Sequence, residues 1–131
     1  AEHIHKHPAI KFMGWQEDIR PFLAAADAFV FPSYREGFPN VILQAGAMGL
    51  PCIVTNINGC NEIIENGKNG IIPPHDSEYL YRTMCGFLSS PRLVEQLASA
   101  ARPQIVQKYD RRTLWEALRK VYQEQISNLT K

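Results

Sequence analysis

Residues 31–51 have the sequence FPSYREGFPNVILQAGAMGLP, which predicts the end of a strand, a loop and one helix. The apolar run before this stretch ends at Pro32, which cannot donate a hydrogen bond to a sheet and therefore suits the exit of a strand. After a polar loop, Pro39 is expected to open a helix, because its φ is already helical and its missing N–H would be unpaired there. The Gly49-Leu50-Pro51 run is expected to end this helix. A helix N-terminus that faces a polar loop suits an anionic ligand.

The segments on either side of this stretch alternate between strand and helix patterns. Short apolar runs bounded by glycine, proline or asparagine predict strands, and apolar residues at helical spacing predict helices. This alternation is typical of βαβ units, so the expected fold class is α/β, with a Rossmann-like parallel sheet and flanking helices. The expected strands are 9–13, 28–31, 51–55 and 70–72, and the expected helices between them are 15–26, 39–49 and 61–65.

From residue 76 onward the chain has a helical pattern to its end. Helices are expected over 76–90, from Pro91 onward, and over 110–127 as a carboxy-terminal helix. Pro103 lies inside the second of these helices and is expected to kink or break it. The last helix carries an apolar stripe that must pack against another surface. The positions that follow this helical spacing are Leu114, Leu118, Val121, Tyr122 and Gln125, of which the first four form the apolar stripe.

Size and composition are those of one soluble globular domain over residues 1–131. The chain is 45% hydrophobic and 21% charged, and no apolar run approaches the roughly 20 residues that a membrane span needs. A net charge of +1 gives no basic surface for nucleic acid. Three cysteines without a CxxC pair favour reduced thiols, so a cytoplasmic location is expected.

Three histidines alternate near the start of the chain, at His3, His5 and His7. On an extended segment they would share one face and could in principle share a metal ion. No fourth ligand lies nearby and Pro8 ends the run. A solvated linker is therefore the favoured interpretation, and no metal site is predicted.

Residues 31–76 also carry a spaced set of glycines, prolines and polar residues. The set comprises Pro32-Ser33, Glu36-Gly37-Phe38-Pro39-Asn40-Val41, Ala45, Gly49-Leu50-Pro51, Gly59, Glu62-Ile63-Ile64, Asn66-Gly67 and Asn69-Gly70. In order and spacing this set strongly resembles the carboxy-terminal, donor-binding domain of retaining glycosyltransferases with the GT-B fold, of the group 1, family 4 type. These enzymes use nucleotide-activated sugars to build polysaccharides and glycoconjugates. A looser match extends over nearly the whole chain.

The resemblance implies roles for the loop and for the start of its helix. Glu36 would be the catalytic-site carboxylate that meets the hydroxyls of the transferred sugar, with no metal or other cofactor. The N–H groups of Asn40 and Val41 would hold the diphosphate and stabilise the charge that grows on it as the glycosidic bond breaks. Taken alone, Glu36 would be interpreted as a surface carboxylate, but the neighbouring Gly37-Phe38-Pro39-Asn40 and the later Gly49-Leu50-Pro51 favour the functional role. Phe38 suits packing better than ligand binding. The donor sugar and phosphate contacts implied are Gly37, Phe38, Pro39, Asn40 and Val41.

The same resemblance assigns the nucleoside contacts. Gln44 stands where the family carries a second glutamate that binds the ribose; an amide still accepts a hydrogen bond but lacks the charge that strengthens it. Met13, Gly14 and Trp15 would lie near the nucleobase. A solvent-facing Gln44 is almost as good an interpretation, and Met13 and Trp15 would also suit a core.

The expected function is transfer of a sugar from a nucleotide-sugar donor to an acceptor, with this chain as the donor-binding part. The family's basic diphosphate-binding pair and its amino-terminal domain do not appear in these 131 residues. A sugar or lipid-linked acceptor would bind through that missing domain, and the fragment alone would show little or no turnover. The full-length enzyme is expected to associate peripherally with the inner face of a membrane.

Absence of the first strands would leave a sheet edge exposed, and an exposed edge favours self-association of the chain.

Two alternatives remain open for the function. The glutamine at position 44 suggests a non-catalytic nucleotide-sugar-binding module derived from the fold. A nucleotide-sugar epimerase shares the same architecture.

Overall fold

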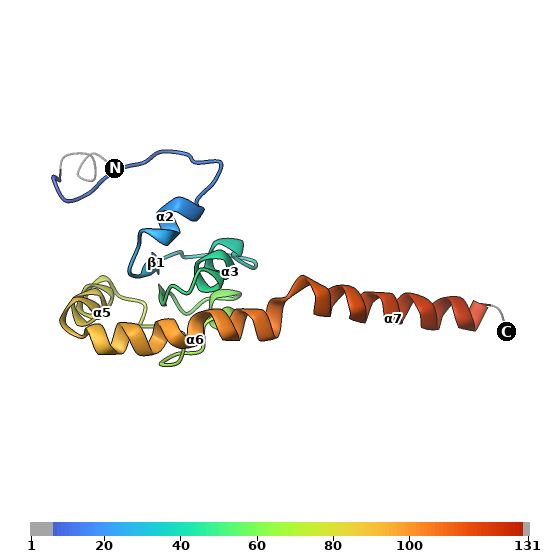
Figure 1. Cartoon of the computed structure of the whole chain (residues 1–131). Coiled ribbons are helices and arrows are strands. Elements are labelled where there is room, and N and C mark those ends of the chain that lie inside the picture. The colour runs from blue at the N-terminus through green and yellow to red at the C-terminus, as the bar shows by residue number, and fades with distance from the viewer. Residues whose placement is uncertain (1–6, 130–131) are drawn as a thin grey trace.

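The computed structural model describes residues 7–129, which form a small parallel sheet with helices on both faces (Figure 1). The elements in chain order are α2 (Arg20–Ala24), β1 (Phe29–Phe31), α3 (Asn40–Ala47), β2 (Cys52–Val54), α4 (Cys60–Ile63), β3 (Gly70–Ile71), α5 (Ser77–Ser89), α6 (Pro91–Tyr109) and α7 (Arg111–Leu129). The α/β class and the helical carboxy-terminal part expected from the sequence are thereby confirmed.

The sheet has the strand order β1-β2-β3, and both pairings are parallel. Phe29 pairs with Cys52, and Ile53 pairs with Ile71. All residues of β2 are buried, because this central strand has a neighbouring strand on each side and helices over each face. Gly70 begins β3 where a Cβ atom would collide with the carbonyl of Cys52, so the close approach of the two backbones requires glycine there.

Alternate residues of the strands feed two hydrophobic clusters on opposite faces of the sheet. Cys52 and Val54 belong to a cluster that also contains residues of α2, α3, α4 and the second half of α6. Ile53 points the other way, into a smaller cluster with Phe87 of α5 and Leu97 of α6. Helix α6 therefore contributes to both clusters. It packs closely on α3 at Gly46, where a Cβ atom would lie 2.7 Å from the side chain of Ile105.

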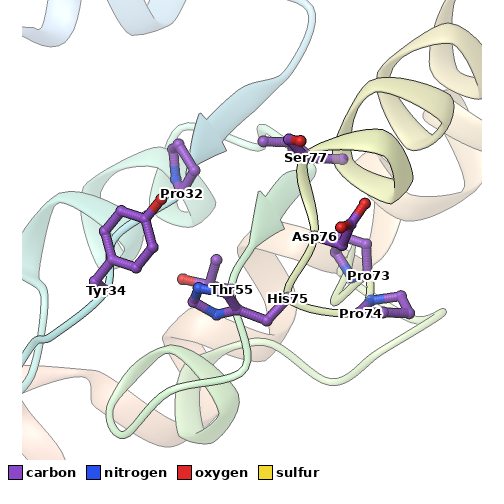
Figure 2. A pocket seen from close by; sticks show the side chains of 9 residues that line it. Pro32, Tyr34, Thr55, Pro73, Pro74, His75, Asp76 and Ser77 are labelled. Atoms are coloured by element: carbon purple, nitrogen blue, oxygen red, sulfur yellow. The ribbon is translucent and has the colours of Figure 1, made fainter.

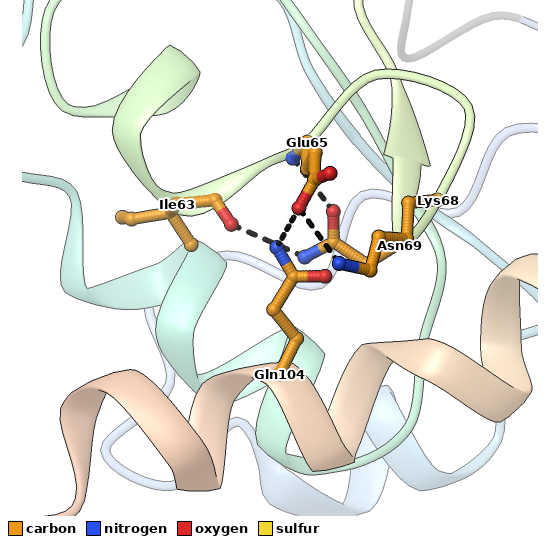
Figure 3. Close-up of polar contacts among 5 residues, drawn as sticks. All are labelled: Ile63, Glu65, Lys68, Asn69 and Gln104. Carbon is orange, nitrogen blue, oxygen red and sulfur yellow. Dashed lines mark hydrogen bonds and ion pairs between the residues drawn. The ribbon is translucent and has the colours of Figure 1, made fainter.

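A polar network holds the connection between α4 and β3 against α6 (Figure 3). The buried Asn69 accepts a hydrogen bond from the N–H of Glu65 at 2.8 Å and donates to the carbonyl of Ile63 at 3.1 Å. The Glu65 carboxylate accepts hydrogen bonds from Lys68 at 3.0 Å and from Gln104 at 3.2 Å. Asn69 thus satisfies backbone groups that the short turn would otherwise leave unpaired.

Two expectations for the amino-terminal part are wrong. Residues 9–13 are exposed and form no strand, because none of the described residues supplies a strand for them to pair with beyond β1. The helix expected over 15–26 is reduced to the single turn of α2. The Asp18 carboxylate accepts a hydrogen bond from the N–H of Arg20 at 3.0 Å. A side chain that binds the backbone in this way competes with helical hydrogen bonds, so the helix begins only at Arg20.

Pro103 does not break α6, which runs without interruption from residue 91 to residue 109. Both Pro103 and Ser99, whose carbonyl loses its helical N–H partner, are exposed. Water can therefore hydrogen-bond to that carbonyl, which lowers the cost of a proline inside the helix.

Helix α7 extends away from the rest of the molecule (Figure 1) and contains no buried residue. Its apolar stripe, expected to pack against another surface, is exposed to solvent in this chain. Within residues 7–129, no helix is long and apolar enough to cross a membrane.

Candidate functional site

The loop that follows β1 holds Glu36 in a defined position. The Ser33 hydroxyl donates a hydrogen bond to the Glu36 carboxylate at 2.8 Å. The Ser33 carbonyl in turn accepts a hydrogen bond from the hydroxyl of Thr55, the residue that follows β2. Two adjacent parallel strands thus fix the carboxylate at the carboxyl edge of the sheet, where open α/β sheets commonly bind ligands.

The loop is also packed against the start of α4 through Gly59. Gly59 has φ +76, and a Cβ atom there would lie 2.5 Å from the carbonyl oxygen of Gly37 and 2.7 Å from Cδ of Pro39. The backbone around Gly37 therefore rests directly on that of Gly59. At Gly37 itself a Cβ atom would meet nothing within 4 Å, so the space on that side of the loop is open.

The N-terminus of α3 faces this loop without a side-chain cap. Pro39 is the N-cap and not the first helical residue, so α3 begins one residue later than expected. Ile42 donates a hydrogen bond to the Pro39 carbonyl at 3.1 Å. In the described part of the chain, the N–H groups of Asn40 and Val41 have no acceptor. Free donors at the positive end of a helix dipole can bind an anion.

Gln44 lies one turn into α3 and is exposed. It lines a hollow of about 510 Å³ with Glu17, Asp18, Ile19 and Arg20. Asp18 is paired with Arg20 at 2.8 Å, and the hydrogen bonds from Arg20 lower the pKa of this carboxyl group to about 2. The structure therefore brings Gln44 next to two carboxylates that precede α2, a proximity that chain order did not reveal.

Met13, Gly14 and Trp15, the expected base contacts, are all exposed, with Met13 at 52% and Trp15 at 85%. They precede α2 in an extended segment that runs outside the sheet (Figure 1). The alternative interpretation of Met13 and Trp15 as core residues is wrong. These three residues do not line the hollow that contains Gln44.

Two aromatic pairs flank the loop. The Phe38 ring lies 5.7 Å from that of Tyr109, whose hydroxyl donates to the carbonyl of Glu62 at 2.9 Å. This contact agrees with a packing role for Phe38. The Tyr34 ring lies 5.2 Å from that of His75 (Figure 2), and sequence reasoning gave neither residue a functional role.

The cysteines are placed as structural residues. Cys52 and Cys60 are buried. Burial raises the pKa of Cys52 to about 12, and burial followed by the negative charge of Glu36 raises the pKa of the Cys60 thiol. Both thiols are therefore poor nucleophiles. Residues 7–129 contain no group of three or more histidine, cysteine or acidic residues able to hold a metal, and His3 and His5 lie outside that range.

Comparison with known proteins establishes the family. The family model described as glycosyl transferases group 1 matches residues 1–90. The sheet, its flanking helices and the long carboxy-terminal helix match the carboxy-terminal domain of GT-B glycosyltransferases. The chain therefore belongs to the group 1 glycosyl transferases.

Three relatives illustrate this membership. The chain is 34% identical over 109 residues to the lipopolysaccharide core biosynthesis glycosyltransferase LpsE of Rhizobium meliloti, a match that covers 82% of this chain and 32% of that protein. It is 50% identical over 60 residues to UDP-Gal:alpha-D-GlcNAc-diphosphoundecaprenol alpha-1,3-galactosyltransferase of Escherichia coli, covering 46% of this chain and 16% of that protein. The crystal structure of Anabaena HepE in complex with UDP-glucose matches with a TM-score of 0.84 and 25% identity, covering 94% of this chain and 34% of HepE.

The chain spans about a third or less of the length of the curated relatives described above. Donor-binding domains of this family come from enzymes of polysaccharide and glycoconjugate biosynthesis.

Proposed function

We propose that this chain is the donor-binding part of a metal-independent retaining glycosyltransferase that transfers a hexose from a nucleotide-sugar donor. The observation that carries the proposal is the juxtaposition of Glu36, fixed by Ser33, with the free N–H groups of Asn40 and Val41. A sugar diphosphate needs both kinds of group: an acceptor for its hydroxyls and donors for its phosphate oxygens.

Glu36 is the residue that we assign to the donor sugar. Its carboxylate is half-buried and already accepts one hydrogen bond from Ser33, which restricts its orientation before any ligand binds. Each carboxylate oxygen retains further capacity to accept hydrogen bonds from sugar hydroxyls. The open space on the outer side of Gly37 leaves room for the sugar ring next to the loop backbone.

The N–H groups of Asn40 and Val41 are assigned to the phosphate. When the glycosidic bond breaks, negative charge grows on the leaving diphosphate. Donors held in place by α3 stabilise that charge without reorganising, so they lower the barrier more than they strengthen ground-state binding. Gly37, Phe38 and Pro39 contribute by holding the backbone in this position against Gly59.

Gln44 is assigned to the ribose, with the segment Met13-Gly14-Trp15 toward the base. The hollow beside Gln44 supports this assignment because it opens on the same helix as the phosphate donors, one turn further along. The complex of HepE with UDP-glucose supports a uridine nucleotide as the first one to test.

The test replaces Asn40 by proline, which removes one N–H at the helical position that best tolerates proline. Pro39 has φ −77 and ψ 102, the extended conformation that suits a residue before proline, and Asn40 is exposed. Asn40→Pro should weaken UDP-glucose binding by about tenfold or more, since a hydrogen bond to a charged group contributes about 1.5–3 kcal/mol. Isothermal titration calorimetry with the 131-residue chain measures this change.

Asn40→Ala is the matched control because it removes the side chain and keeps the N–H. It should bind UDP-glucose as the unsubstituted chain does. Equal losses in the two variants would assign the effect to the side chain and contradict a phosphate site made of backbone donors. Absence of UDP-glucose, UDP-galactose and GDP-mannose binding to the unsubstituted chain would contradict the proposal as a whole.

A non-catalytic nucleotide-sugar-binding module is the second candidate, favoured by the presence of an amide at position 44. Gln44→Glu should raise UDP-glucose affinity several-fold, because a charged acceptor forms the stronger bond to a ribose hydroxyl. Placed in the full-length protein, the variant should also raise UDP release from UDP-glucose if that protein is an enzyme, whereas release stays at zero if it is a binding module. Gln107→Glu, on an exposed part of α6, controls for added charge. Unchanged affinity would show that Gln44 does not contact the ribose.

A further inference from the structure

A second hollow lies at the carboxyl edge of the sheet, apart from the helix end assigned to the phosphate. Its volume is about 280 Å³, and its walls include a residue just beyond each of the three strands: Pro32 directly after β1, Thr55 directly after β2 and Pro73 two residues after the end of β3. The remaining walls come from Tyr34 and from the segment that leads into α5 (Figure 2). This volume is just below the roughly 300–1,000 Å³ typical of small-molecule sites and suits a single ring rather than a dinucleotide.

Two rings offer an apolar surface at this hollow. Tyr34 and His75 lie with their ring centroids 5.2 Å apart and their planes at 49° (Figure 2). Tyr34 is 83% exposed, so a large aromatic side chain is displayed to solvent at a concave edge of the molecule. The hydrophobic effect alone would not favour that exposure, and aromatic side chains with a polar tip are frequent at surfaces that bind ligands.

The same hollow displays hydrogen-bonding groups that the protein does not use. Among the described residues, no partner is present for the Tyr34 hydroxyl, the Ser77 hydroxyl or Oδ2 of Asp76, whereas Oδ1 of Asp76 accepts from the N–H of Glu78 at 2.8 Å. The Thr55 hydroxyl donates to Ser33 and keeps its capacity to accept. A ligand with several hydroxyl groups would satisfy these donors and acceptors.

The charge of the hollow argues against a nucleotide or phosphate as its ligand. Its walls contain no lysine or arginine, and they contain the Asp76 carboxylate. An anion would therefore meet the negative charge of Asp76 without a lysine or arginine to offset it. A neutral sugar ring meets both requirements, because its C–H face is apolar and its edge carries hydroxyl groups.

We propose that the hollow between Tyr34 and His75 is a subsite for one neutral pyranose ring, distinct from the phosphate site at α3. Tyr34 precedes Glu36 by two residues on the same loop, and Thr55, which lines the hollow, hydrogen-bonds to Ser33, which holds Glu36. A ring bound there would contact Tyr34 on the loop that carries the assigned sugar-contacting carboxylate, and Thr55, which hydrogen-bonds to the same loop. A role of the subsite in sugar transfer rests on the proposed function, whereas its ability to bind a pyranose ring does not.

The experiment measures binding of methyl α-D-glucopyranoside and methyl α-D-galactopyranoside to the 131-residue chain by saturation-transfer difference NMR. Both Tyr34→Ala and His75→Ala should weaken binding of the preferred glycoside by about threefold to tenfold, the range expected for losing one aromatic contact. Tyr122→Ala, which removes an exposed tyrosine from α7, should have no effect. Thermal unfolding of each variant shows that the fold is retained.

Competition identifies the source of the ring and separates this proposal from the previous one. If UDP-glucose and UDP both leave the glycoside bound, the subsite serves an acceptor sugar. If UDP-glucose displaces the glycoside and UDP does not, the hexose of the donor itself occupies the subsite. Absence of binding for both glycosides, or binding that is insensitive to Tyr34 and His75, overturns the subsite whatever the affinity for UDP-glucose.

Discussion

At the scale of single residues, Gly59 links the candidate site to the fold. It adopts φ +76 and its Cα faces the backbone of Gly37. Two separate penalties therefore attach to any side chain at this position: a backbone conformation that side chains rarely adopt, and a collision with the loop that carries Glu36.

Gly59→Ala should lower the free energy of unfolding by at least about 2 kcal/mol and should also weaken UDP-glucose binding, because the loop must move. Gly67→Ala is the matched control: its φ is +81, but a Cβ atom there meets nothing within 4 Å. The control should therefore lose only the conformational part, about 1–2 kcal/mol, and keep binding. Urea unfolding measures both values. An equal loss of stability and unchanged binding in the two variants would contradict a structural link between Gly59 and the loop.

The resemblance found in the sequence pointed to Glu36 and to Gly59 but could not show which residues contact them. Ser33 reaches Thr55 and Gly37 reaches Gly59, and each pair is 22 positions apart in the chain. These separations are within one residue of the offset of the parallel register, in which Phe29 pairs with Cys52, because both pairs lie just beyond the ends of β1 and β2 or in the loops that follow them. Register depends on tertiary packing. The sequence therefore revealed which types of residue form the site, but not which residues from other strands and loops they contact.

At the scale of elements, the sequence predicted best where local signals and packing agree. The strand before Pro32, the helix that follows Pro39 and the strand after Pro51 are all present. Each has a turn residue at its boundary and apolar residues that reach one of the two clusters. Local propensity and burial lead to the same element there.

Prediction failed where an element depends on a partner or on solvent. Residues 9–13 have a strand pattern, yet no described strand is beside them. Pro103 carries a strong local signal against helix, but its exposed position lets water satisfy the carbonyl that it frees. Burial and exposure decided both cases, and neither can be read from a short window of sequence.

At the scale of the whole molecule, the two candidate sugar-binding features and α7 lie on different parts of the chain. The loop of Glu36, the α3 N-terminus and the Tyr34–His75 hollow gather around the ends of the strands. Helix α7 extends away from this edge and displays an apolar stripe (Figure 1). Exposed stripes of this kind favour association with another apolar surface.

The stripe on α7 is complementary to itself. In an antiparallel pair with its two-fold axis at Leu118, Leu114 of each copy faces Tyr122 of the other. The same register brings Arg112 near Glu124, which adds attraction between opposite charges. A two-fold axis makes both contacts occur twice.

We therefore expect the 131-residue chain to form concentration-dependent dimers through α7. Replacing two stripe residues, Leu118→Glu with Val121→Glu, should leave a monomer, because four carboxylates would then lie in the apolar contact. Adding the same charge on the opposite face, Thr113→Glu with Gln123→Glu, should leave the dimer intact. Sedimentation velocity over a range of protein concentrations distinguishes these states. A monomer at every concentration would contradict the prediction. If the stripe variant still forms dimers, the interface is not on α7, and the open edge of β1 becomes the next candidate.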